Sequence, residues 1–254
     1  MSTAWPYPRW IAHRGAGKLA PENTLAAFRM GAAHGYRMFE CDVKLSRDGV
    51  PFVMHDAALS RTTNADQMLG ADASPTAGEH DWGQLARLDA GGWHSRQYAG
   101  EPLPTLENIA RFCLANGHFL NIEIKPTPGQ DAATGRVVGE HAARLWQGQV
   151  PPLLSSFQPE ALWGARATAP QLPRALLLDT LWDGWLDTAR ELGCAAIVCN
   201  HALWDAALVR RAHAEGWRAL SYTVNDAQAA RRLIDLGTDG IITDQVDLFV
   251  STGP

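Results

Sequence analysis

Short apolar runs alternate with longer helical patterns along most of the chain. The apolar runs are typical of buried strands, and the longer segments have the periodicity of helices. Eight major runs lie near residues 11, 39, 121, 154, 176, 197, 221 and 241. Regular alternation of strand and helix predicts a parallel sheet covered by helices. Because eight such units close a (β/α)8 TIM barrel, we predict an α/β barrel.

The helices predicted between these strands have recognisable ends. They are expected over residues 24–34, 132–146, 160–167, 185–192, 206–215 and 227–236. Asn23 is a suitable N-cap for the first of them, and Gly35 is a suitable stop. A doubly wound open sheet is the alternative fold. It usually carries a GxGxxG turn after its first strand, and the segment from His13 to Gly17 lacks that spacing.

The alternation is interrupted between residues 57 and 104. This stretch is rich in Asp, Thr, Gly and Ala, and it is too long for a plain connection. A short extended piece over residues 51–54 precedes it, just after the turn signal Asp48-Gly49. We therefore predict a single TIM-barrel domain over residues 1–254, with residues 57–104 as a small insertion after the second strand.

The composition is that of a globular protein, since 46% of the 254 residues are hydrophobic and 19% are charged. The formal net charge of -5 gives no electrostatic reason to expect nucleic acid as a partner. The four cysteines show no CxxC pair and no zinc-binding spacing, so buried thiols in a reducing compartment are expected. No secretory signal and no run of about 18 apolar residues is seen. We therefore expect a soluble, cytoplasmic protein without a membrane anchor.

Three carboxylates are expected to meet at one end of the barrel. Glu40 and Asp42 lie two residues apart on a predicted strand, which places both side chains on one face, and Glu123 lies on a later strand run. Two like charges about 4 Å apart repel by about 4 kcal/mol at an effective dielectric near 20. Three such contacts would rival the whole stability of a domain, about 5–15 kcal/mol, unless a cation lies between them. Hard oxygen ligands favour Mg2+, Ca2+ or Mn2+ over zinc.

Ordinary ion pairing is the alternative explanation for these acids. The two strand carboxylates could pair separately with Arg14, Arg37 or Lys44, and Arg14 could pair with Glu22. For an arbitrary Glu-x-Asp sequence this interpretation would be preferred. The apolar run around the pair and the nearby histidines favour the metal site instead.

Two histidines follow strand-like runs near these acids. His13 ends the first run, and His55 ends the short piece after the second. Displacement at a phosphodiester needs a base on one side of phosphorus and an acid on the other, and histidine can do either near neutral pH. Arg14 and Lys125 are candidates to neutralise the non-bridging phosphate oxygens. These residues predict an acid–base pair with two phosphate contacts.

Several other polar and aromatic residues have simpler explanations. Asn225 and Asp244 follow the last two strand runs, where each is expected to cap the next helix. Trp93, Trp182 and Trp204 fall in or near loops, where any of them could line a substrate pocket. Packing is the simpler expectation for each tryptophan.

Taken together, the motifs resemble those of the glycerophosphodiester phosphodiesterase family, and they follow the family's order over nearly the whole chain. They are His13-Arg14-Gly15, Pro21-Glu22-Asn23-Thr24, Glu40-x-Asp42-Val43, His55-Asp56, Leu88-Asp89-Ala90-Gly91, Leu103-Pro104-Thr105-Leu106-Glu107, Glu123-Ile124-Lys125, Tyr222-Thr223-Val224-Asn225 and Gly240-Ile241-Ile242-Thr243-Asp244. The full set is far more specific than any one piece. Tyr222 is one departure, because the family often has Trp there, and we expect it to affect pocket shape and substrate preference.

The resemblance implies a metal-dependent hydrolase built on a TIM barrel. The residue roles that it implies are metal ligands at Glu40, Asp42 and Glu123, an acid–base pair of His13 and His55, and phosphate contacts from Arg14 and Lys125. A divalent cation, Mg2+ or Ca2+, would be the cofactor, and a small glycerophosphodiester the substrate. In the family the neighbouring glycerol hydroxyl is thought to attack phosphorus, giving a cyclic phosphate that water then opens. The products are glycerol 3-phosphate and an alcohol such as choline or ethanolamine, which implies a place in lipid and glycerol metabolism.

Two other functions fit the same residues. A phospholipase-like relative would act on intact lipids, and it should show an exposed apolar rim or a membrane anchor. A non-catalytic barrel would only bind phosphoryl ligands, but binding alone requires no acid–base pair. The two histidines and three carboxylates therefore favour hydrolysis.

Overall fold

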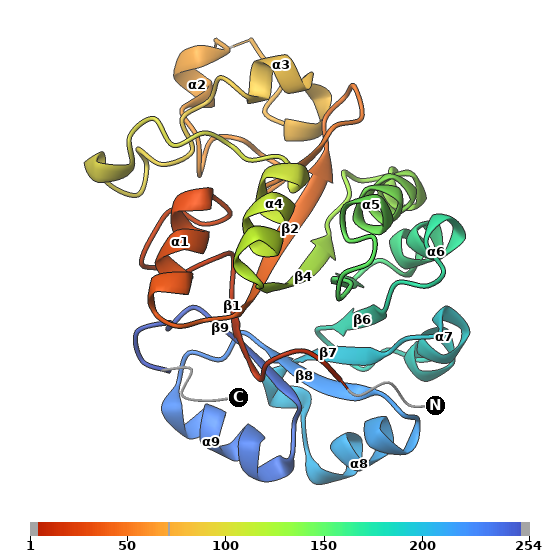
Figure 1. Ribbon diagram of the computed structural model, residues 1–254. Helices are drawn as coiled ribbons and strands as arrows, with labels where there is room; N and C mark the ends of the chain where they lie inside the picture. The colour runs from red at the N-terminus through yellow and green to blue at the C-terminus, as the bar shows by residue number, and fades with distance from the viewer. Residues whose placement is uncertain (1–4, 71, 250–254) are drawn as a thin grey trace.

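In the computed structural model, which describes residues 5–70 and 72–249, eight parallel strands close into a barrel (Figure 1). These strands are β1 (Trp10–Ala12), β2 (Met38–Leu45), β4 (Phe119–Ile124), β5 (Leu153–Ser156), β6 (Arg174–Leu178), β7 (Ala196–Asn200), β8 (Arg218–Tyr222) and β9 (Gly240–Thr243). They pair in the order β1-β9-β8-β7-β6-β5-β4-β2, and pairing of β1 with β2 closes the ring. The predicted (β/α)8 TIM barrel is confirmed.

Helices surround the barrel on its outside (Figure 1). They are α1 (Leu25–Ala33), α4 (Leu106–Asn116), α5 (Asp131–Leu145), α6 (Pro159–Thr168), α7 (Trp185–Leu192), α8 (Ala206–Ala214) and α9 (Ala227–Leu236), and a short turn, η3 (His201–Leu203), follows β7. All of the longer helices except α4 match the predicted ranges to within one residue at each end. Among the helices of the described residues, none combines the length and apolar character needed to cross a bilayer.

The helix α4 was not among the predicted helices, although its ends carry clear signals. Thr105 and Asn108 form a capping box at its start, and Gly117 ends it in the left-handed region with φ 65°. The pattern was missed because α4 directly follows the long insertion. It completes the βα unit of β2, which the insertion separates from its helix.

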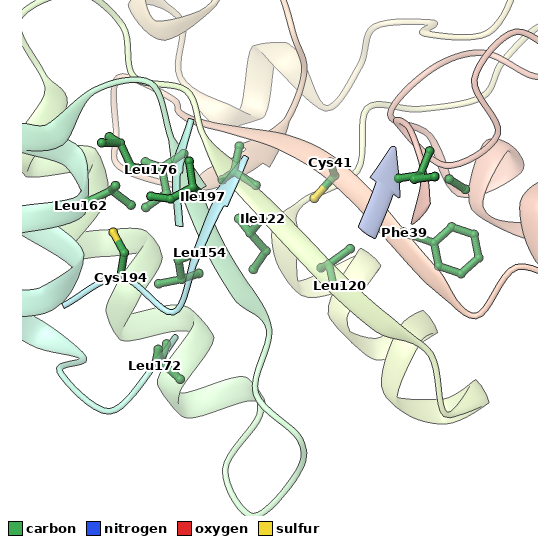
Figure 2. Packing of buried hydrophobic residues seen from close by; sticks show 14 of the residues in the cluster. Phe39, Cys41, Leu120, Ile122, Leu154, Leu162, Leu172, Leu176, Cys194 and Ile197 are labelled. Atoms are coloured by element: carbon green, nitrogen blue, oxygen red, sulfur yellow. The ribbon is translucent and has the colours of Figure 1, made fainter. Parts of the chain in front are cut away.

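The outer face of each barrel strand packs against the helices. On β2, Phe39, Cys41 and Val43 belong to the large apolar core between barrel and helices. Figure 2 shows Phe39 and Cys41 close to Leu120 and Ile122 of the neighbouring strand β4. All four cysteines are free and buried, as predicted.

The inner face of β2 changes from apolar to polar along the strand. Its first residue, Met38, lies in a second apolar cluster with Ile11 and Leu220 of other barrel strands. Glu40 and Asp42 follow Met38 in two-residue steps, so they share its face and lie nearer the carboxyl end of the strand. That end of a TIM barrel carries the functional side chains.

The insertion after β2 lies beyond the carboxyl end of that strand (Figure 1, orange to yellow). The strand β3 (Pro51–Val53), which pairs antiparallel with β2, precedes it. The insertion itself contains the short helices α2 (Ala65–Met68), η1 (Ala77–Glu79), α3 (Trp82–Leu85) and η2 (Arg96–Tyr98). Buried side chains such as Phe52, Leu59 and Leu85 form a separate small core. The insertion therefore has its own anchorage beside the barrel mouth.

The helices α5 and α6 approach each other through glycines, and this contact predicts a stability effect. A Cβ at Gly135 would overlap the carbonyl oxygen of Ala161. We expect Gly135→Ala to lower the free energy of unfolding by about 1–3 kcal/mol because the helices must move apart. Gly83→Ala in α3, where a Cβ meets nothing within 4 Å, is the matched control and should not destabilise. Urea denaturation measures both, and equal midpoints for Gly135→Ala and the parent would contradict the close-packing argument.

Candidate active site

The three predicted carboxylates meet at the carboxyl end of the barrel. The strand register places Glu40 opposite Asn121 and Asp42 opposite Glu123 on the adjacent parallel strand. One carboxylate oxygen from each of Glu40, Asp42 and Glu123 lies within 4.8 Å of the others. Glu40 and Asp42 are almost completely buried, with exposed fractions of 2% and 1%. The expected convergence of the acids is therefore found.

The buried acids have strongly altered proton affinities. Burial, followed by the charge of Asp42, raises the pKa of Glu40 to about 8. Burial and the charge of Asp42 also raise the pKa of Glu123. For Asp42 itself, burial opposes ionisation, but Lys125 and Arg14 outweigh it and hold the pKa below its ordinary value. The cluster thus contains one firmly ionised carboxylate flanked by two that resist a further negative charge.

The carboxylate cluster has the features of a cation site. Two of its buried oxygens, Glu40 Oε1 and Asp42 Oδ1, accept no hydrogen bond from the described residues. Buried carboxylate oxygens without donors are costly unless a cation satisfies them. An all-oxygen donor set suits a hard divalent ion such as Mg2+ or Ca2+. The residues present therefore fit such an ion.

Two cations already reach the cluster, so ion pairing and metal binding are not exclusive. Arg14 Nε lies 3.4 Å from Asp42 Oδ2, and Lys125 Nζ lies 3.4 Å from Asp42 Oδ1 and 3.0 Å from Glu123 Oε1. Arg14 also donates to Glu22 at 2.8 Å, the pairing considered in the sequence. Lys44 instead donates to the carbonyl oxygen of Lys125, and burial lowers its pKa to about 8. Arg14 and Lys125 thus compensate the charge of Asp42, whereas the pKa of Glu40 stays raised despite them.

Two residues of the loop after β1 have strained backbone conformations and hydrogen-bond to the acids. Arg14 has φ 51° and Asn23 has φ 61°, both in the left-handed region that favours glycine. The Arg14 amide donates to Glu40 Oε2 at 3.0 Å. Asn23 donates from Nδ2 to Asp42 at 2.8 Å and accepts from the Asp42 amide at 3.2 Å. Backbone strain at these two positions therefore accompanies direct support of the acids.

The prediction that Asn23 caps the first helix is wrong. Thr24 is the N-cap of α1, and its side chain accepts from the amide of Ala27. Asn23 could not be assigned correctly from local sequence because its partner, Asp42, lies on the next strand. The two-way hydrogen bond to Asp42 makes Asn23 part of the site.

His13 is fixed by an acid that directly follows the last strand of the barrel. Its Nδ1 lies 2.6 Å from Asp244 Oδ1, and its Nε2 lies 3.8 Å from Glu40 Oε2. Burial lowers the pKa of His13, but the Asp244 hydrogen bond and the Glu40 charge outweigh it and raise the value. With Nδ1 held by a carboxylate, Nε2 is the ring nitrogen left to act on a substrate.

The capping roles expected for Asn225 and Asp244 are also wrong. Asn225 donates to Asp244 Oδ2 at 2.8 Å and accepts from the Asp244 amide at 2.9 Å, while Asp226 caps α9. Sequence reasoning missed both residues as parts of the site. Their positions just beyond β8 and β9, at the end of the barrel that carries function, are the signal that could have found them.

His55 is held in a similar way from the insertion side. Its Nδ1 lies 2.6 Å from Asp56 Oδ1. Burial is the main reason that the pKa of His55 falls below its ordinary value, and Arg14 and Lys125 act in the same direction. Each predicted histidine thus has a carboxylate on Nδ1, although the two pKa values shift in opposite directions.

A cleft of about 360 Å3 opens beside the carboxylates. Glu123, Lys125 and Phe157 are among its lining residues. Phe157 meets Tyr222 edge to face, with ring centroids 5.6 Å apart. Of the three tryptophans considered as pocket residues, Trp204 is only 2% exposed and donates to the carbonyl oxygen of Leu220, so it cannot line an open pocket.

Comparison with known proteins agrees with this arrangement. The sequence model of the Glycerophosphoryl diester phosphodiesterase family matches residues 13–248, a range that contains every predicted site residue. The chain belongs to this family. Membership confirms the predicted family and, with it, the predicted class of enzyme, a phosphoric diester hydrolase.

Members of the family with similar sequences and structures cover nearly the whole chain. A glycerophosphodiester phosphodiesterase of Caldanaerobacter subterraneus subsp. tengcongensis is 29% identical over 246 residues, which are 95% of this chain and 96% of that protein. A phosphodiesterase of Oleispira antarctica, solved in complex with the product sn-glycerol-3-phosphate, is 33% identical with a TM-score of 0.85, covering 94% of this chain and 93% of that one. A glycerophosphodiester phosphodiesterase of Agrobacterium tumefaciens str. C58 is 26% identical with a TM-score of 0.76, covering 96% and 100%.

Proposed function

We propose that this chain hydrolyses glycerophosphodiesters to glycerol 3-phosphate and an alcohol, with a divalent cation held by Glu40, Asp42 and Glu123. The observation that carries the proposal is the convergence of these three carboxylates within 4.8 Å. The family match and the relative solved with sn-glycerol-3-phosphate support it. When bound, the cation supplies positive charge for the phosphate oxygens and helps to orient the substrate.

The side chains around the carboxylates supply the remaining chemistry. Arg14 and Lys125 neutralise non-bridging phosphate oxygens, since both nitrogens lie beside Asp42 at the same end of the barrel. One of the two histidines, His13 or His55, removes the proton from the glycerol hydroxyl next to the ester, and that oxygen attacks phosphorus. The bond from phosphorus to the alcohol oxygen breaks, and the other histidine protonates the departing alcohol. Water then opens the cyclic phosphate with the two proton transfers reversed.

The neighbouring hydroxyl gives this mechanism a direct test. We expect glycerophosphocholine to release glycerol 3-phosphate and choline, while the analogue with 1,3-propanediol in place of glycerol is not cleaved because it has no neighbouring hydroxyl. Intact phosphatidylcholine should also resist, since its acyl ester occupies that oxygen. Cleavage of the propanediol analogue at a similar rate would exclude the cyclic intermediate. Preferential cleavage of phosphatidylcholine would support the alternative of a lipid-directed enzyme.

Metal binding is expected to release a proton at neutral pH. The pKa of Glu40 is raised to about 8 in the metal-free protein, so this carboxyl is mostly protonated at pH 7 and must lose its proton to bind a cation. We expect the affinity for Mg2+ to rise between about pH 6 and pH 8 and to level off above that range. Calorimetry in two buffers of different ionisation enthalpy measures the proton directly. An affinity independent of pH, with no proton released, would contradict this role of Glu40.

We also propose that the enzyme works in the cytoplasm. The four cysteines are buried and free, which supports a reducing compartment.

A further inference from the structure

We infer that Arg61, which belongs to the insertion, is a positioning residue that holds the side chains of Arg14 and His55 in their places at the site; the inference rests on the proposed function. Its guanidinium bridges two carboxylates. It donates from Nη1 and Nη2 to Glu22 at 2.8 and 2.7 Å. It also donates from Nε and Nη2 to the two oxygens of Asp56.

Each of these carboxylates also holds one of the residues proposed to act on the phosphate. Glu22 Oε1 accepts from Arg14 Nη1 at 2.8 Å. Asp56 Oδ1 lies 2.6 Å from His55 Nδ1. The result is one continuous hydrogen-bonded network of side chains, Arg14–Glu22–Arg61–Asp56–His55. Its two ends lie at the barrel mouth, and Arg61 is at its centre.

The charges of Glu22 and Asp56 explain why Arg61, at the centre of this network, is needed. The Arg61 hydrogen bond is the largest cause of the lowered pKa of Asp56. Burial opposes ionisation of Glu22, but Arg61 and Arg14 outweigh it and lower its pKa as well. Both carboxylates are thus ionised, and both contact the single nitrogen Nη2 of Arg61. Without the guanidinium they would repel each other and carry Arg14 and His55 away from their positions.

The planar guanidinium is needed for this arrangement. It presents donors on two edges in fixed directions, which lets it grip two carboxylates at once, whereas a lysine ammonium is a single point charge. The Arg61 side chain is 44% exposed, so ion pairs at this place contribute little to folding stability. A change there is therefore expected to act on activity more than on stability.

The insertion fixes the position of Arg61. Leu59, two residues earlier, is 1% exposed in the small core of the insertion. Thr63, two residues later, donates from its hydroxyl to the carbonyl oxygen of Leu59. Arg61 is thus carried on an anchored turn, and through it the insertion contacts the supports of the site.

The experiment compares Arg61→Ala and Arg61→Lys with Arg47→Ala in the full chain, using glycerophosphocholine with Mg2+. Arg47 is the matched control, because it makes a bidentate ion pair with Asp81, at 2.8 and 2.6 Å, on an exposed part of the surface. We expect Arg61→Ala to lower kcat about 10- to 100-fold with a much smaller change in KM. Arg61→Lys should recover only part of this loss, and added methylguanidinium should partly rescue Arg61→Ala. Arg47→Ala should stay within about twofold of the parent.

Phosphate binding tests the role of Arg61 independently of turnover. Inorganic phosphate binding, measured by calorimetry with Mg2+ present, should weaken about tenfold in Arg61→Ala and not in Arg47→Ala, because Arg14 is misplaced. A lowered melting temperature with unchanged kcat and unchanged phosphate affinity would show a merely structural role and overturn the inference. If the parent itself cleaves no glycerophosphodiester, the proposed function fails, and the phosphate comparison still decides the role of Arg61. Should Arg61→Ala fail to fold, Arg61→Lys decides, and parent-like kcat and phosphate binding in it would reject the need for a guanidinium.

Discussion

Replacing either His13 or His55 by alanine is expected to lower kcat by about 10²- to 10⁴-fold while leaving divalent-cation binding in place. Each imidazole has its Nδ1 held by a carboxylate at 2.6 Å, so only Nε2 is left to move a proton at the substrate. Displacement at phosphorus needs one proton taken and one given, and neither histidine can do both at once. Loss of either should therefore stop most turnover.

The control for the histidine variants is His213→Ala. His213 also pairs with a carboxylate, Asp239, at 2.8 Å, but it lies on α8 at the outside of the barrel. Steady-state kinetics on glycerophosphocholine give kcat, and calorimetry with Mg2+ shows whether the metal site survives. Turnover within about twofold of the parent in His13→Ala or His55→Ala would remove that residue from the mechanism.

The second large effect is expected from Glu40→Gln, which should weaken Mg2+ binding by at least about 100-fold. Glutamine keeps the shape of the side chain and an oxygen that can accept from the Arg14 amide, as Glu40 does at 3.0 Å. It removes only the negative charge that a cation requires. Because burial raises the pKa of Glu40 to about 8, glutamine resembles the protonated form present at pH 7 without metal.

This resemblance separates metal binding from folding. The metal-free Glu40→Gln variant should melt at nearly the same temperature as the metal-free parent, whereas added Mg2+ should stabilise only the parent. Glu107→Gln is the matched control, since Glu107 is an exposed acid on α4 that pairs with Arg111 at 2.7 Å. Equal stabilisation of parent and Glu40→Gln by Mg2+ would show that Glu40 is not a ligand.

The elements of the barrel could be predicted from the sequence because their patterns are local. The strands Met38–Leu45 and Phe119–Ile124 are buried almost throughout, and their apolar runs with polar residues at every second position mark them clearly. The same alternation placed Glu40, Asp42 and Glu123 on one face. Their convergence followed once eight strands were recognised as a closed barrel.

The residues that hold the site residues in place could not be predicted, because their partners are distant in the sequence. Asp244 and His13 are 231 residues apart, and Asn23 and Asp42 are 19 apart. Asp244 and Asn23 each stand where a helix N-cap is expected from the local sequence, so a capping role was predicted for both. Arg61 gave no signal at all, since its two carboxylates come from different loops.

Chelation tests the central claim most directly, namely that the three converging carboxylates hold an ion beside which the ester is cut. The measurement is the rate of glycerol 3-phosphate release from glycerophosphocholine by protein freed of metal with EDTA, before and after Mg2+ or Ca2+ is added back. We expect negligible release without metal and recovery that saturates at one ion per chain. Full activity in excess EDTA would contradict the account.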